Sequence, residues 1–181
     1  MHEPPRNNFT VQLMPQWAPI GVDRVVQLAE AQFFDNMPFF RALPNFLVQF
    51  GIPVSKEKFN YWNRQGNIQD DPPANPKIPF TDGIVSFAGY GDNSRGTHLF
   101  FALGDQPGLG SRKWEVPVGR TVEGMDVIHS IYTGYGDSVD QRNLSPNSPG
   151  SAQYLRKFPK LDRILGCDII HDDSSHLNAE L

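Results

Sequence analysis

Residues 39–51 read FFRALPNFLVQFG and contain one charged side chain, Arg41, in a run of apolar and aromatic residues. A guanidinium stays protonated at any working pH, so Arg41 can donate hydrogen bonds and hold positive charge but cannot serve as an acid or base. Alternation puts Arg41, Leu43 and Gln49 on one face of extended chain, although Pro44 interrupts the period. From these residues alone two interpretations stay open. Arg41 is either a site cation or a strand arginine that reaches water or pairs with a carboxylate.

Two further stretches accompany this one in the sequence. Residues 83–101 read GIVSFAGYGDNSRGTHLFF, and residues 118–127 end in VEGMDV. Together with FFRxxPxFLVQ they resemble, in the same order, three sequence segments of the cyclophilins, which are peptidyl-prolyl cis-trans isomerases. The three stand in order within the span from residue 9 to residue 170, over which the resemblance extends. The resemblance implies a mainly β fold, a closed antiparallel barrel of about eight strands capped by two α-helices.

The resemblance also assigns site residues. It implies that Arg41 is the catalytic donor and that Phe46, Leu47 and Phe100 line a pocket for the proline ring. Gln49 would orient the arginine or the substrate. The remaining substrate-binding positions implied by the second stretch are Ala88, Gly89 and His98.

The implied reaction needs no cofactor, metal or nucleophile. A peptide C–N bond has partial double-bond character and a rotation barrier of roughly 18–20 kcal/mol. The two isomers of an X–Pro bond are close in energy, yet they exchange slowly. A catalyst must therefore favour the twisted amide, whose nitrogen regains a lone pair that a positioned donor can stabilise.

The sequence departs from the cyclophilin pattern around the site. Phe40 stands where the family has a His, Gly89 where it has an Asn, and His98 where it has a Gln. Glu115 stands near the place of a late pocket His. The Trp that contacts cyclosporin in the family has no clear match, because Trp114 is close but out of register, so cyclosporin binding is expected to be weak.

Apolar periodicity predicts the regular elements. Strands are expected at residues 9–13, 84–88, 99–103, 116–120 and 163–170. One helix is expected from Val22 to about Phe34, and a second begins at Thr121 with a buried stripe of Val122, Met125, Ile128 and Ile131.

Two polar segments, residues 52–80 and 134–154, are expected to be insertions in a single domain spanning residues 1–181. Tyr61 and Trp62 are expected to fasten the first segment to the domain. The second, with its own aromatic residues, is the expected surface for a protein partner. Asp70 and Asp71 precede Pro72 and predict a turn rather than a metal site or an acid pair. The polar tail from about residue 172 is expected to be mobile.

Composition and charge argue against several classes of protein and kinds of site. A net charge of −4 gives no general affinity for nucleic acid or anionic membranes. No apolar run is long enough to span a bilayer. The single Cys167 cannot form an internal disulfide, and no Cys/His cluster has the spacing of a zinc site. A soluble protein in a reducing compartment, cytosol or organelle interior, is compatible with this pattern.

Three functions are weighed. The first is an isomerase acting on proline-containing peptides or protein clients. The second is a catalytically weak binding or scaffold module with the cyclophilin fold, which the altered rim and the two insertions favour. The third is an unrelated barrel with hydrolase or metal chemistry, against which stands the lack of a Ser/His/Asp or ligand cluster.

Overall fold

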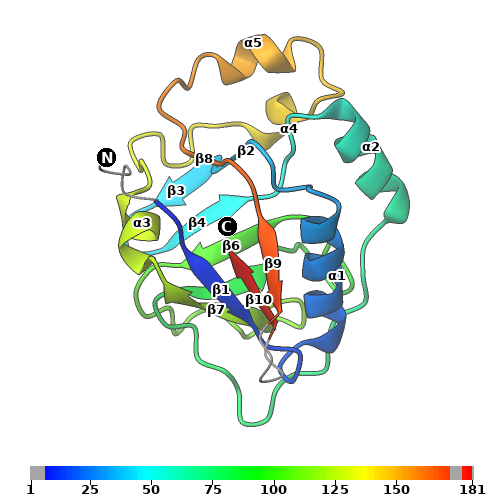
Figure 1. Ribbon diagram of the computed structural model, residues 1–181, viewed down its shortest axis with the longest axis vertical. Coiled ribbons are helices and arrows are strands. Elements are labelled where there is room, and N and C mark those ends of the chain that lie inside the picture. Colours follow the sequence, from blue (N-terminus) through cyan, green and yellow to red (C-terminus); the bar gives the residue numbers. More distant parts are fainter. Residues whose placement is uncertain (1–6, 172–176, 181) are drawn as a thin grey trace.

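The computed structural model describes residues 7–171 and the backbone of residues 177–180, and one antiparallel sheet dominates it (Figure 1). Its strands run in the order β3-β4-β6-β5-β7-β1-β10-β9, and β2 and β8 form a separate two-stranded ribbon. The bounds are β1 Thr10–Leu13, β2 Met37–Pro38, β3 Arg41–Leu43, β4 Leu47–Phe50, β5 Ile84–Phe87, β6 Leu99–Ala102, β7 Pro117–Glu123, β8 Arg163–Ile164, β9 Asp168–His171 and β10 Leu177–Glu180. The fold is therefore mainly β, as expected.

The sheet has two apolar faces because neighbouring residues on a strand point to opposite sides. On β4 and β6, Val48 and Phe101 belong to the main core, which also contains Leu28 of the first helix. Leu47 and Phe100 belong instead to a smaller cluster on the other face. The outer face of the sheet is therefore also packed, and it is the face that carries Arg41.

The described residues form five helical segments, where two were expected. They are α1 Pro19–Glu30, α2 Lys56–Gln65, α3 Met125–Ser130, α4 Gln141–Leu144 and α5 Ser151–Leu155. The first helix starts at Pro19, which suits the first helical position, and ends four residues before the predicted Phe34. Its buried face holds Val22, Val25 and Leu28.

The predicted start of the second helix was wrong. Thr121 and Val122 continue strand β7, where the Thr121 N–H donates to the Gly83 carbonyl at 2.9 Å. Gly124 then turns the chain with φ +73°, and α3 begins only at Met125. A Cβ at Gly124 would lie 2.2 Å from the Asn8 carbonyl oxygen, so the turn requires glycine there.

The segment 52–80 is not loop throughout, because it contains α2. The Ser55 hydroxyl caps that helix by accepting from the Lys58 N–H at 3.2 Å. Trp62 is buried against Phe33, as expected, whereas Tyr61 is 48% exposed. Trp62 alone therefore buries this helix against the core.

The interpretation of Asp70 and Asp71 as turn residues was wrong, because both carboxylates converge on the buried guanidinium of Arg95. Asp71 also accepts from the N–H groups of Ile20 and Gly21, each at 2.8 Å, at the start of α1. A negative charge at a helix N-terminus is favourable. This buried pair ties the 52–80 segment, α1 and the 89–96 loop together.

The tail prediction is corrected for residues 177–180, which form β10 and pair with β1 and β9. Residues 172–176 and 181 lie outside the described residues. Within the described part of the chain, no helix is both long and apolar enough to cross a membrane.

Candidate functional site

Arg41 lies in a row of residues that runs across four strands. It faces Gln49 on β4, which faces Phe100 on β6, which in turn faces Ser86 on β5. Residues paired in this way present their side chains on the same face of a sheet. The pairing therefore brings the predicted catalytic donor, its orienting amide and one pocket aromatic residue onto one surface.

The Arg41 guanidinium is held on three sides. Its Nε donates to Asp137 Oδ1 at 2.5 Å, and its Nη1 donates to Gln49 Oε1 at 3.4 Å. The Phe46 ring lies 5.7 Å from its Cζ, in cation–π geometry. The side chain is 27% exposed. Within the described residues Nη2 has no hydrogen-bond partner, so this end can donate to a bound molecule.

A cavity of about 490 Å³ opens beside Arg41. Five of the eight predicted site residues line it: Arg41, Gln49, Ala88, Gly89 and His98. The other lining residues, which sequence reasoning missed, are Asn63, Asn67, Tyr90, Ser94, Gly96, Thr97 and Gln141. The cavity is thus surrounded mainly by amide, hydroxyl and backbone groups.

Phe46, Leu47 and Phe100 are not among the residues that line this cavity. Leu47 and Phe100 are each 5% exposed and belong to the outer-face cluster, against which Phe46 and Ala88 pack. The Phe80 ring stacks on Phe100 with centroids 6.0 Å apart. Ala88 belongs to the cavity wall and to this cluster, so the apolar surface adjoins the polar cavity.

His98 is a neutral member of the cavity wall. Burial lowers the pKa of its imidazole to about 4, so it is uncharged at neutral pH. Its ring meets the Phe40 ring edge to face, with centroids 5.7 Å apart. It can therefore offer a hydrogen-bond donor or acceptor, but no charge, to a bound molecule.

The glycine at position 89 has a steric reason. A Cβ placed there would come within 2.6 Å of Trp114 Cδ1 and 2.7 Å of Ser94 Oγ. Contacts that short force a neighbour to move. Trp114 therefore packs directly over the Gly89 backbone, and the sequence alone gave no sign of this contact.

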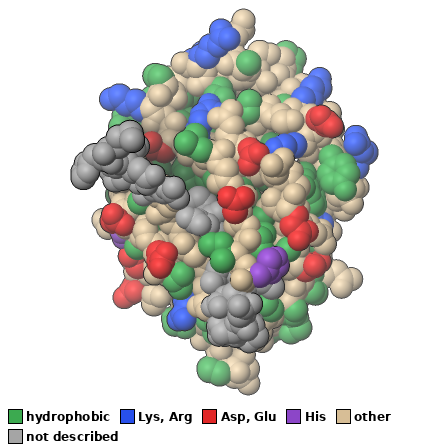
Figure 2. All heavy atoms as spheres, in the orientation of Figure 1, with side chains coloured by type: hydrophobic (Ala, Val, Ile, Leu, Met, Phe, Trp, Pro, Cys, Tyr) green, Lys and Arg blue, Asp and Glu red, His purple; other side chains and the backbone are tan. Residues whose placement is uncertain are grey.

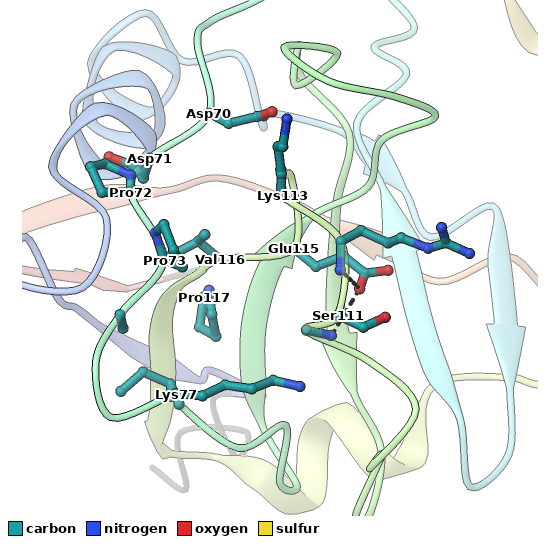
Figure 3. Close-up of a pocket in the computed structure, with 14 residues that line it drawn as sticks. Asp70, Asp71, Pro72, Pro73, Lys77, Ser111, Lys113, Glu115, Val116 and Pro117 are labelled. Atoms are coloured by element: carbon teal, nitrogen blue, oxygen red, sulfur yellow. Dashed lines mark hydrogen bonds between the residues drawn. The ribbon is translucent and has the colours of Figure 1, made fainter.

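A second cavity, of about 530 Å³, lies between the segments 70–78 and 110–117 (Figure 3). Glu115, the residue near the place of the family's late pocket His, lines this cavity rather than the one beside Arg41. Its carboxylate accepts from the N–H groups of Gly110 and Arg112 at 2.8 and 3.2 Å. Glu115 therefore holds its own loop.

The chain matches known proteins over most of its length. Residues 2–148 match the family model described as cyclophilin type peptidyl-prolyl cis-trans isomerase. The chain is 33% identical over 125 residues to peptidyl-prolyl cis-trans isomerase-like 1 of Aspergillus niger, covering 68% of this chain and 75% of that relative. It is 28% identical over 134 residues to peptidyl-prolyl cis-trans isomerase CYP18-2 of Arabidopsis thaliana, covering 74% and 79%. It spans only 22% of peptidyl-prolyl cis-trans isomerase 9 of Schizosaccharomyces pombe, at 29% identity over 143 residues and 78% of this chain.

Solved structures agree on the fold. A cyclophilin from Hirschia baltica superposes with a TM-score of 0.57 at 16% identity, covering 87% of this chain and 83% of its own. A cyclophilin type isomerase from Cryptosporidium parvum, solved in the presence of the dipeptide Ala-Pro, gives a TM-score of 0.54 at 18% identity, covering 68% and 80%.

Proposed function

The chain belongs to the cyclophilin-type peptidyl-prolyl cis-trans isomerases and is an isomerase of X–Pro bonds, and from this premise we propose that Arg41 is its catalytic residue. The observation that carries the proposal is the restrained guanidinium with its Nη2 directed to no protein partner in the described residues. A charge-assisted hydrogen bond to the amide nitrogen of the twisted state contributes about 1.5–3 kcal/mol. This corresponds to about one to two decades of rate.

The substrate pocket is proposed to form at the junction of the polar cavity and the outer-face cluster. The partly buried Phe46 and Ala88 supply apolar surface for the proline ring, and the buried Leu47 and Phe100 support them from beneath. Ala88 joins this surface to the cavity. The Gly89 backbone and His98, which line the cavity, are proposed to hydrogen-bond the flanking peptide. Proline-containing peptides or protein clients are therefore the proposed substrates.

The test is a coupled assay of X–Pro isomerisation in a short peptide. Arg41→Ala is expected to lower kcat/KM at least tenfold with unchanged circular dichroism. Arg120→Ala is the matched control, because Arg120 also bonds a cross-strand glutamine, Gln12 at 3.1 Å, but is exposed on β7. Equal rates for wild type and Arg41→Ala would overturn the assignment.

Weak cyclosporin binding is also proposed. Trp114 packs on the Gly89 backbone, so its indole is committed to a contact with the 89–96 loop. A missing rim indole removes a donor and a large contact area. Titration that gave nanomolar affinity would contradict this proposal.

A protein partner at the outer part of the 134–154 insertion is the second candidate. None of the residues of α5 is buried, and α5 projects at the top of Figure 1. Figure 2 shows Lys and Arg side chains mainly in the upper part of that face. An acidic partner segment fits such a surface. Arg156 and Lys157 are exposed and directly follow α5, at the C-terminal edge of the insertion. The double variant Arg156→Glu/Lys157→Glu should lose such a partner while keeping peptide isomerisation, and retention of the partner would count against this candidate.

Barrel closure is a further proposal. The ribbon of β2 and β8 is continuous in chain with the outer strands of the sheet, because β2 leads to β3 and β8 leads to β9. The Phe39 N–H also donates to the Asp162 carbonyl at 3.0 Å. Slow hydrogen exchange at the Phe39 amide would support closure there, and fast exchange would oppose it.

A further inference from the structure

We propose that Asp137, which lies in the 134–154 insertion, is a positioning residue for isomerisation and acts by holding the Arg41 guanidinium. The inference rests on the proposed catalytic role of Arg41. The two residues are 96 positions apart in the chain, and their side chains meet at 2.5 Å. The insertion is thus part of the site rather than an appendage to it.

The contact with Asp137 is the stronger of the two polar restraints on Arg41. It joins opposite charges at short range, whereas the amide oxygen of Gln49 is neutral and lies 3.4 Å from Nη1. Charge-assisted hydrogen bonds are roughly twice as strong as neutral ones. The carboxylate takes Nε and leaves Nη2 directed to no partner among the described residues, so it fixes the group without occupying its free end.

Backbone contacts place Asp137 beside the strand that carries Arg41. Gly136 forms an antiparallel bridge with Ala42, the residue after Arg41. A tight turn precedes Asp137, in which the Gly136 N–H donates to the Thr133 carbonyl at 3.0 Å. Gly136 has φ +49°, a conformation that glycine adopts without strain. The position of the carboxylate is therefore set by the backbone on its N-terminal side.

An apolar cluster fixes the other side of the insertion. Phe40, only 1% exposed, packs with Val139 and Leu144, and Tyr135 and Tyr154 pack against the same cluster. The tyrosine hydroxyls add two hydrogen bonds, since Tyr154 accepts from the Asp140 N–H at 2.8 Å and Tyr135 accepts from the Lys160 N–H at 3.2 Å.

Arg41, the first residue of β3, and Phe40, which directly precedes it, thus contact the insertion from opposite sides of the backbone. Phe40, which stands where the family has a His, is buried under the insertion, and Arg41 is held by Asp137. Phe40 and Asp137 therefore act together: the apolar contact of Phe40 positions the insertion, and the ion pair with Asp137 orients the Arg41 guanidinium.

The expected effect follows from the freedom of an arginine side chain. A long side chain loses considerable conformational entropy when it is fixed, and fixing it before the reaction removes that loss from the activation barrier. Asp137 is 64% exposed, so solvent screens its charge and reduces the extent to which it offsets the positive field of Arg41. The hydrogen bond to Nε depends on direct contact at 2.5 Å and still orients the guanidinium. Positioning therefore outweighs charge cancellation, and removal of the carboxylate should slow the reaction.

The experiment measures kcat and KM of the whole chain with a short X–Pro peptide. Asp137→Ala should lower kcat three- to tenfold with little change in KM. The amide oxygen of Asp137→Asn can still accept from Nε, so its kcat should lie between those of wild type and Asp137→Ala. Asp140→Asn is the matched control, since Asp140 lies in the same insertion but pairs with Arg142. It should leave the rate within twofold of wild type.

Two readouts separate positioning from a merely structural role. Added salt screens an exposed ion pair, so rising NaCl should narrow the gap between wild type and Asp137→Ala. The Arg41 Nε–H should give a slowly exchanging NMR signal in wild type that is lost in Asp137→Ala. An unchanged gap or an unchanged signal would overturn the inference.

The Arg41→Ala background distinguishes this inference from the proposed function. If Arg41→Ala is slow and adding Asp137→Ala slows it no further, Asp137 acts through Arg41, as proposed. If Asp137→Ala alone has the rate of wild type, or slows both backgrounds equally, the positioning role is overturned while the role of Arg41 stands. If Arg41→Ala itself has the rate of wild type, the proposed function fails first.

Discussion

The carboxylate of Asp71 and the guanidinium of Arg95 meet 2.8 Å apart, and both side chains are fully buried. Arg95 also donates to the Gln69 carbonyl, and its Cζ lies 5.5 Å from the Phe87 ring. Charges buried at this depth are stable only when they are paired and hydrogen-bonded. The pair fixes the loop that carries Ser94 and Gly96 of the cavity wall.

Removal of the Asp71 charge should therefore destabilise the whole domain. Asp71→Asn removes the nearer of the two carboxylates that face the buried Arg95 and leaves only that of Asp70, at 3.5 Å. It is expected to lower the free energy of unfolding by up to about 3–5 kcal/mol. Denaturant unfolding measures this change. Lys113→Ala, which breaks the exposed pair with Asp92, is the control and should leave the unfolding midpoint almost unchanged. Similar shifts in the two variants would contradict the argument.

His98 should make the fold sensitive to acid. Its pKa is about 4 in the folded chain and near 6.5 in a solvated chain, so between these values only the unfolded state takes up a proton. The contribution of the neutral His98 to the free energy of unfolding is fully present above pH 6.5 and is lost as the pH falls toward 4. His98→Gln should remove at most about 2.5 kcal/mol of that loss at pH 4.5. Parallel stability–pH curves for wild type and His98→Gln would show that another group is responsible.

Gly89→Ala should be costly because its new methyl group meets Trp114. The 2.6 Å approach forces the indole or the loop to shift, and overpacking of this kind costs typically 1–3 kcal/mol. The shift should also lower isomerase activity, since Gly89 lines the cavity. In a Trp114→Ala background the same substitution should cost much less. Equal costs in the two backgrounds would exclude the indole as the obstacle.

Cys167 should be unreactive in the folded chain. Burial, followed by the charges of Asp168 and Asp35, raises the pKa of its thiol to about 12, so the reactive thiolate is scarce at pH 8. A disulfide reagent should therefore label it slowly in the native protein and rapidly in denaturant. Native labelling as fast as that of the unfolded chain would mean that the thiol is accessible.

The sequence by itself determined the family, the mainly β fold and the first helix. These rest on local patterns: the alternation of residues 9–13, the apolar stripe of Val22, Val25 and Ala29, and the order of residue types around Arg41. Such patterns are visible because side chains i and i+2 of a strand, or i and i+4 of a helix, share a face. The same alternation predicted that Arg41 and Gln49 share a face, and in the structure the Arg41 guanidinium donates a hydrogen bond to Gln49.

Only the tertiary structure decided which distant residues meet. Asp71 reaches the start of α1 across 50 positions, and Asp137 reaches Arg41 across 96. Neither carboxylate carries a local signal, because hydrogen-bond geometry depends on how loops return to the sheet and not on neighbours in the chain. The space available to a side chain also depends on distant residues. Position 89 requires glycine because Trp114, 25 positions later, packs against its backbone, and only the tertiary structure shows this contact.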